Sequence, residues 1–190
     1  ALMQMSKLHI ALLSLMLGGS IMMTACTPKD STSEHEAESS SLDSKDGSDL
    51  KDKTEAKAIK NFPATPDDAH DIGLLTTYQT QFDSLSHDLE TELQTLEKDN
   101  NLTEDMKSQR KHDLIKSSLN MLKELDLKTE QGRYIQGLYY QYWENQAKVY
   151  QELKQSTDNE LANPTDAIEG MSDYYTAQAQ LEHWQQQTAQ

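Results

Sequence analysis

The chain has 190 residues, of which 17 are Lys or Arg and 32 are Asp or Glu, and its formal net charge is −15. This length fits one domain with extensions. The acidic balance argues against nucleic-acid binding, which depends on Lys and Arg contacts to phosphate. The single cysteine excludes an intrachain disulfide and a multi-cysteine zinc site. Apolar residues make up only 35%, which indicates that part of the chain carries no core.

The N-terminal residues have the layout of an export signal. Residues 5–9 form a short, mildly basic start, with Met5 as the expected initiator and residues 1–4 upstream of it. The apolar run at residues 10–17 is too short for the ~20 residues that a membrane-spanning helix needs. Residues 1–25 are therefore predicted to be a signal peptide that is removed.

The end of this signal, Met23-Thr24-Ala25-Cys26, resembles the lipobox of bacterial lipoproteins, in which an apolar and two small residues precede an obligatory cysteine. The resemblance implies cleavage between Ala25 and Cys26, a diacylglycerol on the Cys26 thiol and an acyl chain such as palmitate on its new amino group. Two or three acyl chains suffice for stable membrane anchoring. In Gram-negative lipoproteins Asp after the cysteine favours the inner membrane, so Thr27 implies the outer membrane. The sequence leaves open whether the domain faces the periplasm or the cell exterior.

A polar segment follows the lipidation site. Residues 27–60 contain ten Ser or Thr, nine acidic and six basic residues, and only three large apolar residues. Such a composition cannot offset the entropy lost on ordering, so it predicts a disordered, acidic, Ser-rich tether. With Pro63 and Pro66 closing it, the predicted linker spans residues 26–66 and the predicted domain spans residues 67–190.

Residues 67–190 show apolar spacing of three and four and no strand alternation, which is typical of helices. We predict helices over residues 68–99, from about 104 to 127, over 130–155, and from Asn163 onward. Thr103 and Thr129 are predicted N-caps, and Pro164 takes the first helical position of the fourth helix. The expected fold is all-α, a three- to four-helix antiparallel bundle behind the disordered tether.

Charge and aromatic content favour a particular arrangement of these helices. The first has a narrow apolar stripe, as in a coiled coil, and six acidic residues within 71–97, whereas the second carries five basic residues. These two are expected to pair. The third contains six of the chain's aromatic residues spread over a wide face, so we expect it to be central.

Three aromatic residues are candidates for partner binding. Tyr134 lies at the edge of the wide face of the third helix, and Tyr140 projects away from it. Trp184 points away from the apolar face of the fourth helix, whose packing is predicted to weaken toward its end. That end is expected either to fray or to dock on a partner.

The sequence contains no strong signal for catalysis, a metal or a cofactor. His87 and Glu90 lie one helical turn apart, but the Glu-x-x-His pairs of a diiron bundle do not occur. No phosphate-binding or dinucleotide-binding motif occurs, and lipid would consume Cys26. We therefore expect neither an enzyme nor a cofactor or metal site.

Taken together, these features favour an outer-membrane-anchored helical lipoprotein that acts as a protein-interaction or assembly module for an envelope protein. One alternative is a self-associating structural surface lipoprotein. A second is a small-ligand-binding helical bundle, which would need a cavity with converging polar groups.

Overall fold

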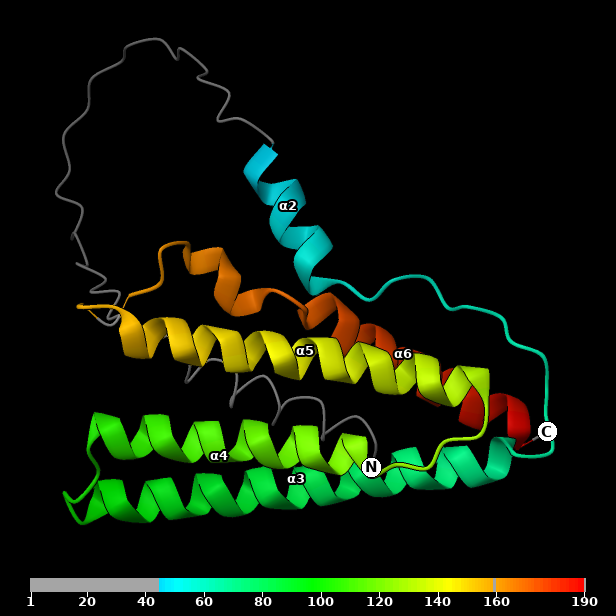
Figure 1. Ribbon diagram of the computed structural model, residues 1–190, viewed down its shortest axis with the longest axis horizontal. Coiled ribbons are helices and arrows are strands. Elements are labelled where there is room, and N and C mark those ends of the chain that lie inside the picture. Colours follow the sequence, from blue (N-terminus) through cyan, green and yellow to red (C-terminus); the bar gives the residue numbers. More distant parts are fainter. Residues whose placement is uncertain (1–44, 159, 190) are drawn as a thin grey trace, which may run out of the picture. The chain divides into compact units, whose positions relative to one another are not determined.

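The fold is known from a computed structural model that describes residues 45–158 and 160–189. Residues 50–190 form one compact unit (Figure 1). No strand occurs in the described residues, so the predicted all-α fold is confirmed. The predicted signal peptide and the lipidation site at Cys26 lie outside them. The elements are α2 (Lys45–Thr54), α3 (Asp68–Lys98), α4 (Glu104–Lys123), α5 (Glu130–Gln155), the 3-10 helix η2 (Pro164–Ile168) and α6 (Met171–Thr188).

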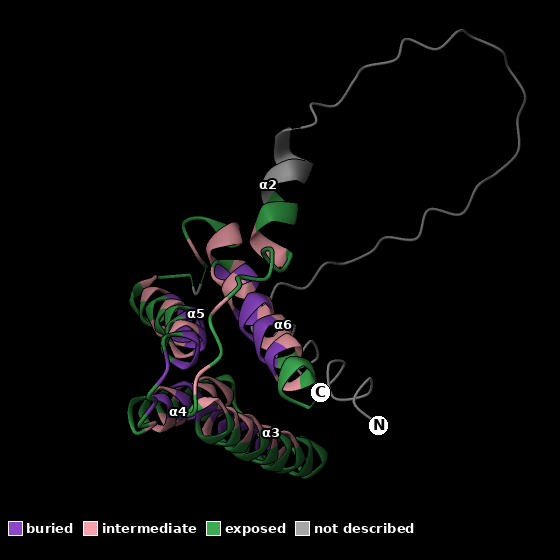
Figure 2. Ribbon diagram, turned by 90° about the vertical axis from the view of Figure 1, so that its right-hand side faces the viewer, coloured by how far each residue is buried: buried purple, intermediate pink, exposed green. Residues whose placement is uncertain are grey.

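Helices α3, α4, α5 and α6 run in alternating directions, as predicted for a bundle with short turns (Figure 1). Helix α5 packs against α4 on one side and α6 on the other, and α3 contacts all three. An end-on view shows the buried residues on the sides that these helices turn toward one another (Figure 2). The predicted central position of the third helix is confirmed.

The predicted N-caps are confirmed. The Thr103 hydroxyl accepts a hydrogen bond from the Met106 N–H at 3.1 Å, and the Thr129 hydroxyl accepts one from the Gly132 N–H at 2.8 Å. Helix α4 ends at Lys123 rather than near residue 127. The Leu122 carbonyl instead accepts a hydrogen bond from the Gln136 side chain at 2.6 Å. This contact ties the end of α4 to α5.

The core of the bundle is aromatic. Tyr142 of α5 lies 4.9 Å from Tyr174 of α6, between ring centroids, and Phe82 of α3 lies 4.8 Å from Trp143. Burying an aromatic side chain of this size contributes about 1.5–3 kcal/mol. The wide face of α5 is therefore filled from both sides.

A buried polar network crosses this core. The Tyr78 hydroxyl lies 2.7 Å from the Ser118 hydroxyl and accepts a hydrogen bond from the Trp143 indole at 3.0 Å. Burial raises the pKa of Tyr78 to about 12, so the phenol stays neutral at physiological pH. Three helices, α3, α4 and α5, thus meet at one hydroxyl group.

The apolar stripe of α3 is used inside the chain. Leu75, Phe82, Leu89 and Leu93 are buried in the bundle. Leu85 is the only large apolar residue of α3 classed as exposed, at 41%. A coiled coil between copies would need this stripe to be free.

The fourth predicted helix is divided in two. Helix η2 follows Asn163, whose side chain accepts from the Thr165 N–H, and Gly170 at φ 82° separates it from α6. That conformation suits glycine because a Cβ would crowd it. The predicted weakening of packing is wrong. Helix α6 continues to Thr188, and Trp184, predicted to point outward, is only 2% exposed.

Part of the predicted linker lies within the described residues. Residues 50–66 belong to the same compact unit as the bundle. Hydrogen bonds to α6 hold part of this segment in place although its side chains are mostly polar. Within the described residues, no helix is long and apolar enough to span a membrane.

Candidate functional site

A strap, residues 55–62, lies along α6 without regular secondary structure. It follows α2 and leads into α3 (Figure 1). Its start, at Glu55, bonds to Ser172 near the beginning of α6. Further along, Lys60 bonds to Gln180, two turns later in the same helix. The strap and α6 therefore advance in the same direction.

Three side chains of α6 bind the strap, and they form a ladder because they are spaced four residues apart on one face. The Ser172 hydroxyl donates to the Glu55 carbonyl at 2.5 Å. The Thr176 hydroxyl accepts from the Lys57 N–H at 2.8 Å and donates to the Ser172 carbonyl. Thr176 and Gln180 are both 0% exposed. We call Ser172, Thr176 and Gln180 the α6 ladder.

Gln180 makes the most complete contact of the ladder. Its Oε1 accepts from the Lys60 N–H at 2.9 Å, and its Nε2 donates to the Lys60 carbonyl at 2.8 Å. One side-chain amide thus satisfies both main-chain groups of one residue. On the strap the contact involves only main-chain groups, so it does not depend on which side chain the strap carries at this position.

Two charged contacts set the position of the strap. Asp173, next to the ladder, pairs with Lys57 at 2.7 Å. This hydrogen bond raises the pKa of the Lys57 ammonium above its ordinary value, against the opposing effect of desolvation. Ahead of the strap, Lys53 pairs with Glu169 at 3.1 Å. Partly exposed pairs of this kind contribute only about 0–1 kcal/mol each, so they select position more than they add stability.

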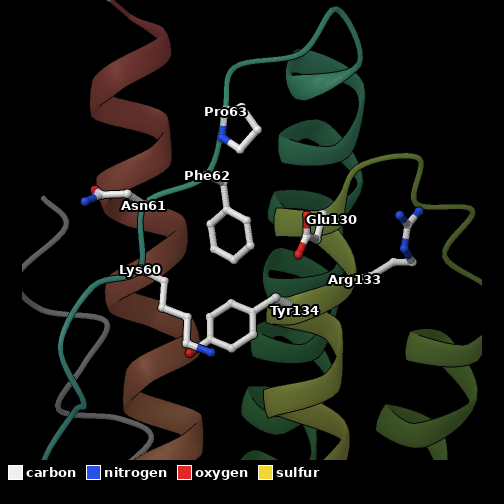
Figure 3. Close-up of a pocket in the computed structure, with 7 residues that line it drawn as sticks. All are labelled: Lys60, Asn61, Phe62, Pro63, Glu130, Arg133 and Tyr134. Carbon is white, nitrogen blue, oxygen red and sulfur yellow. The ribbon is translucent and has the colours of Figure 1, made fainter.

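The far end of the strap covers Tyr134 of α5. The Phe62 ring lies 5.5 Å from the Tyr134 ring, and the Lys60 ammonium sits 4.4 Å from its centroid. Figure 3 shows both side chains directed at Tyr134. They border a surface pocket of about 610 Å³. Glu130 and Arg133 also line this pocket.

The three predicted partner-binding residues lie in different settings. Tyr134 is half-buried beneath the strap. Tyr140 is half-buried on α5 with the Lys123 ammonium 5.8 Å from its ring centroid. Trp184 is buried in the bundle and is not available as a docking surface. Only Tyr134 therefore belongs to the strap site.

The α6 ladder was not predicted from the sequence. Its pattern is present in the sequence as Ser172, Thr176 and Gln180 at a spacing of four. Polar residues at that spacing are typical of a solvated face, and these three are buried instead. The signal available in the sequence was this row of Ser, Thr and Gln beside the apolar face of the same helix.

Asp71 forms a second polar site, and it is a structural one. This carboxylate is 0% exposed and accepts from the Lys128 N–H at 3.0 Å, the Thr129 N–H at 2.7 Å and the Thr129 hydroxyl at 2.7 Å. His70 Nδ1 lies 2.9 Å away. Burial acts to raise the pKa of Asp71, but these hydrogen bonds outweigh it and hold the pKa below its ordinary value. Asp71 thereby fixes α3 to the start of α5, where the helix dipole favours an anion.

In the part of the chain that the structure describes, no three His, Cys, Asp or Glu residues come together as a metal site would require. Comparison with known proteins finds no family model that matches this sequence, no similar curated protein and no similar solved structure.

Proposed function

We propose that this protein is a lipid-anchored helical module of the bacterial outer membrane that holds a protein partner at the envelope. Met23-Thr24-Ala25-Cys26 supports the anchor. The α6 ladder supports the interaction role, and it is the observation that carries the proposal. Its side chains bind main-chain N–H and C=O groups, which every protein partner possesses.

Membrane anchoring is tested by two neighbouring substitutions. Cys26→Ser removes the only thiol, so it should abolish labelling by radioactive palmitate and release the protein from membranes. Thr27→Asp is the matched control, because it should keep the label and shift the protein to the inner membrane. A Cys26→Ser chain that is still labelled and still in the outer membrane would refute the anchor.

Partner binding is tested by crosslinking in cells, with the full lipidated chain, followed by pull-down and mass spectrometry. A discrete envelope protein should be recovered. Crosslinks that join only copies of this chain would refute the proposal in favour of self-association. The buried stripe of α3 argues against that alternative, since Leu75 and Phe82 already pack within one chain.

A further inference from the structure

We propose that the α6 ladder is a binding site for a peptide main chain supplied by the partner, and that the strap is its resting, displaceable occupant. This inference rests on the proposed function and names its site and the chemistry of its partner. In this contact the strap contributes main-chain groups and the α6 ladder contributes side chains, as when a receptor binds an extended peptide.

The contacts define the peptide that fits. Asp173 favours a cation at the position of Lys57, and Gln180 pairs with the main chain three residues later. Tyr134 then receives an aromatic ring at the position of Phe62, two residues further on. A basic residue at the middle position adds a cation–π contact, as Lys60 does. The expected ligand is therefore a non-helical segment of the pattern basic-x-x-basic-x-aromatic.

The strap has the properties of an occupant that can leave. The side chains of residues 55–61 are all exposed, Ile59 at 37% among them, so the strap buries little apolar surface. Its main-chain groups can bond to water once they leave α6. When the strap leaves, the Thr176 hydroxyl keeps its bond to the Ser172 carbonyl, and the Ser172 hydroxyl and Gln180 amide exchange their strap partners for water.

The start of α3 is secured independently of the strap. The Thr65 hydroxyl donates to the Asp68 carboxylate at 2.7 Å, and the Thr65 N–H donates to the same carboxylate at 3.2 Å. These bonds lie after Phe62, between the strap and the first turn of the helix. The strap can therefore detach while the bundle keeps its first helix.

The test uses the full chain carrying Cys26→Ser, in solution, and a fluorescent peptide with the sequence of residues 53–66. Lys57→Pro removes the N–H that bonds to Thr176 and the cation that pairs with Asp173, so it vacates the site. Ala58→Pro is the control, because Ala58 is exposed and its N–H has no acceptor among the described residues. Circular dichroism verifies that each variant keeps its helices.

The peptide should bind the Lys57→Pro chain at least tenfold more tightly than the chain with an intact strap. Adding Gln180→Ala should weaken that binding at least tenfold, and a peptide with Ala in place of Lys57 and Phe62 should bind at least tenfold more weakly. The Ala58→Pro chain should bind less of the peptide than the Lys57→Pro chain does. The proposal would be overturned if the folded Lys57→Pro chain did not bind the peptide at millimolar concentration. It would also be overturned if Gln180→Ala did not weaken the binding.

Hydrogen exchange tests release in the unmodified strap. The Lys57 and Lys60 amides should exchange at least tenfold faster than the buried core amide of Ile115, and excess peptide should accelerate them further. Exchange of all three at one rate would mean that the strap opens only with global unfolding, which overturns the proposal. Both measurements are made without membranes, so their failure leaves the anchoring and crosslinking tests unaffected.

Discussion

The buried carboxylate of Asp71 gives the sharpest stability prediction. Asp71→Asn preserves the size of the side chain but replaces one acceptor oxygen by a donor group. That donor faces the N–H groups and hydroxyl of residues 128 and 129, which all need an acceptor. Hydrogen bonds to charged groups contribute about 1.5–3 kcal/mol each, so we expect a loss of about 2–4 kcal/mol of unfolding free energy. Asp88→Asn, exposed on the same helix, should cost less than ~0.5 kcal/mol.

The pH dependence follows from the lowered pKa of Asp71. In the unfolded chain the carboxyl has an ordinary pKa of about 4, so the folded state binds its proton less readily than the unfolded state. Its stabilising contribution is therefore complete above about pH 4 and is lost as pH falls through the folded-state pKa. The difference in stability between the parent chain and Asp71→Asn should shrink below about pH 4.

Urea unfolding, followed by circular dichroism between pH 7 and pH 2.5, measures both effects. If Asp71→Asn cost no more than Asp88→Asn, the hydrogen bonds at the start of α5 would not contribute as argued. A difference that stays constant down to pH 2.5 would show that the carboxylate charge is not what these donors recognise.

Three further predictions concern the core. Gly132→Ala should cost about 1–3 kcal/mol of unfolding free energy, because its Cβ would lie 2.5 Å from a carboxylate oxygen of Asp71. Gly137→Ala meets nothing within 4 Å and should stabilise the protein by about 0.5–1 kcal/mol. Urea midpoints that move in the same direction for both variants would contradict this. Trp184→Ala should cost about 3–5 kcal/mol and Gln187→Ala less than ~0.5 kcal/mol, and equal thermal midpoints would mean that the end of α6 is frayed. Tyr78, with its pKa raised to about 12, should remain neutral when exposed phenols titrate near pH 10. Stability should therefore fall above pH ~10, because the unfolded chain loses the Tyr78 proton before the folded chain does. Absorbance at 295 nm in the native protein should show Tyr78 titrating after the exposed tyrosines, and a single transition near pH 10 would contradict the buried network.

The bundle was predictable because its signals are local. Thr103 and Thr129 cap helices through their own side chains, and the spacing of apolar residues marks the buried faces of α3 and α5. The division of the fourth helix was also encoded locally, at Gly170, but a glycine in a helical pattern does not by itself reveal a left-handed conformation. Trp184 was misplaced because it continues the four-residue spacing of Ser172, Thr176 and Gln180, a row that is polar in sequence but buried in the structure.

The strap was not predictable from its composition. A disordered tether is predicted where apolar side chains are too few to offset the ordering entropy, and main-chain contacts do not enter that balance. The strap is held by its main chain, through the N–H groups of Lys57 and Lys60. Its partners, Thr176 and Gln180, lie about 120 residues later in the chain, at separations of 119 and 120. Main-chain recognition over such a separation leaves no pattern in the segment that is recognised.

The direction of the strap has a mechanical consequence. The N-terminal segment joins it at the Glu55 end, so tension in that segment reaches the contact with Ser172 before the contact with Gln180. For a pull directed away from α6 the contacts break one after another, and each rupture needs little force. Peeling the strap would release about 28 Å of extended chain before any load reached the Thr65–Asp68 bonds that secure α3. With the proposed lipid anchor at Cys26, the strap would then lengthen under load before any force reached the bundle.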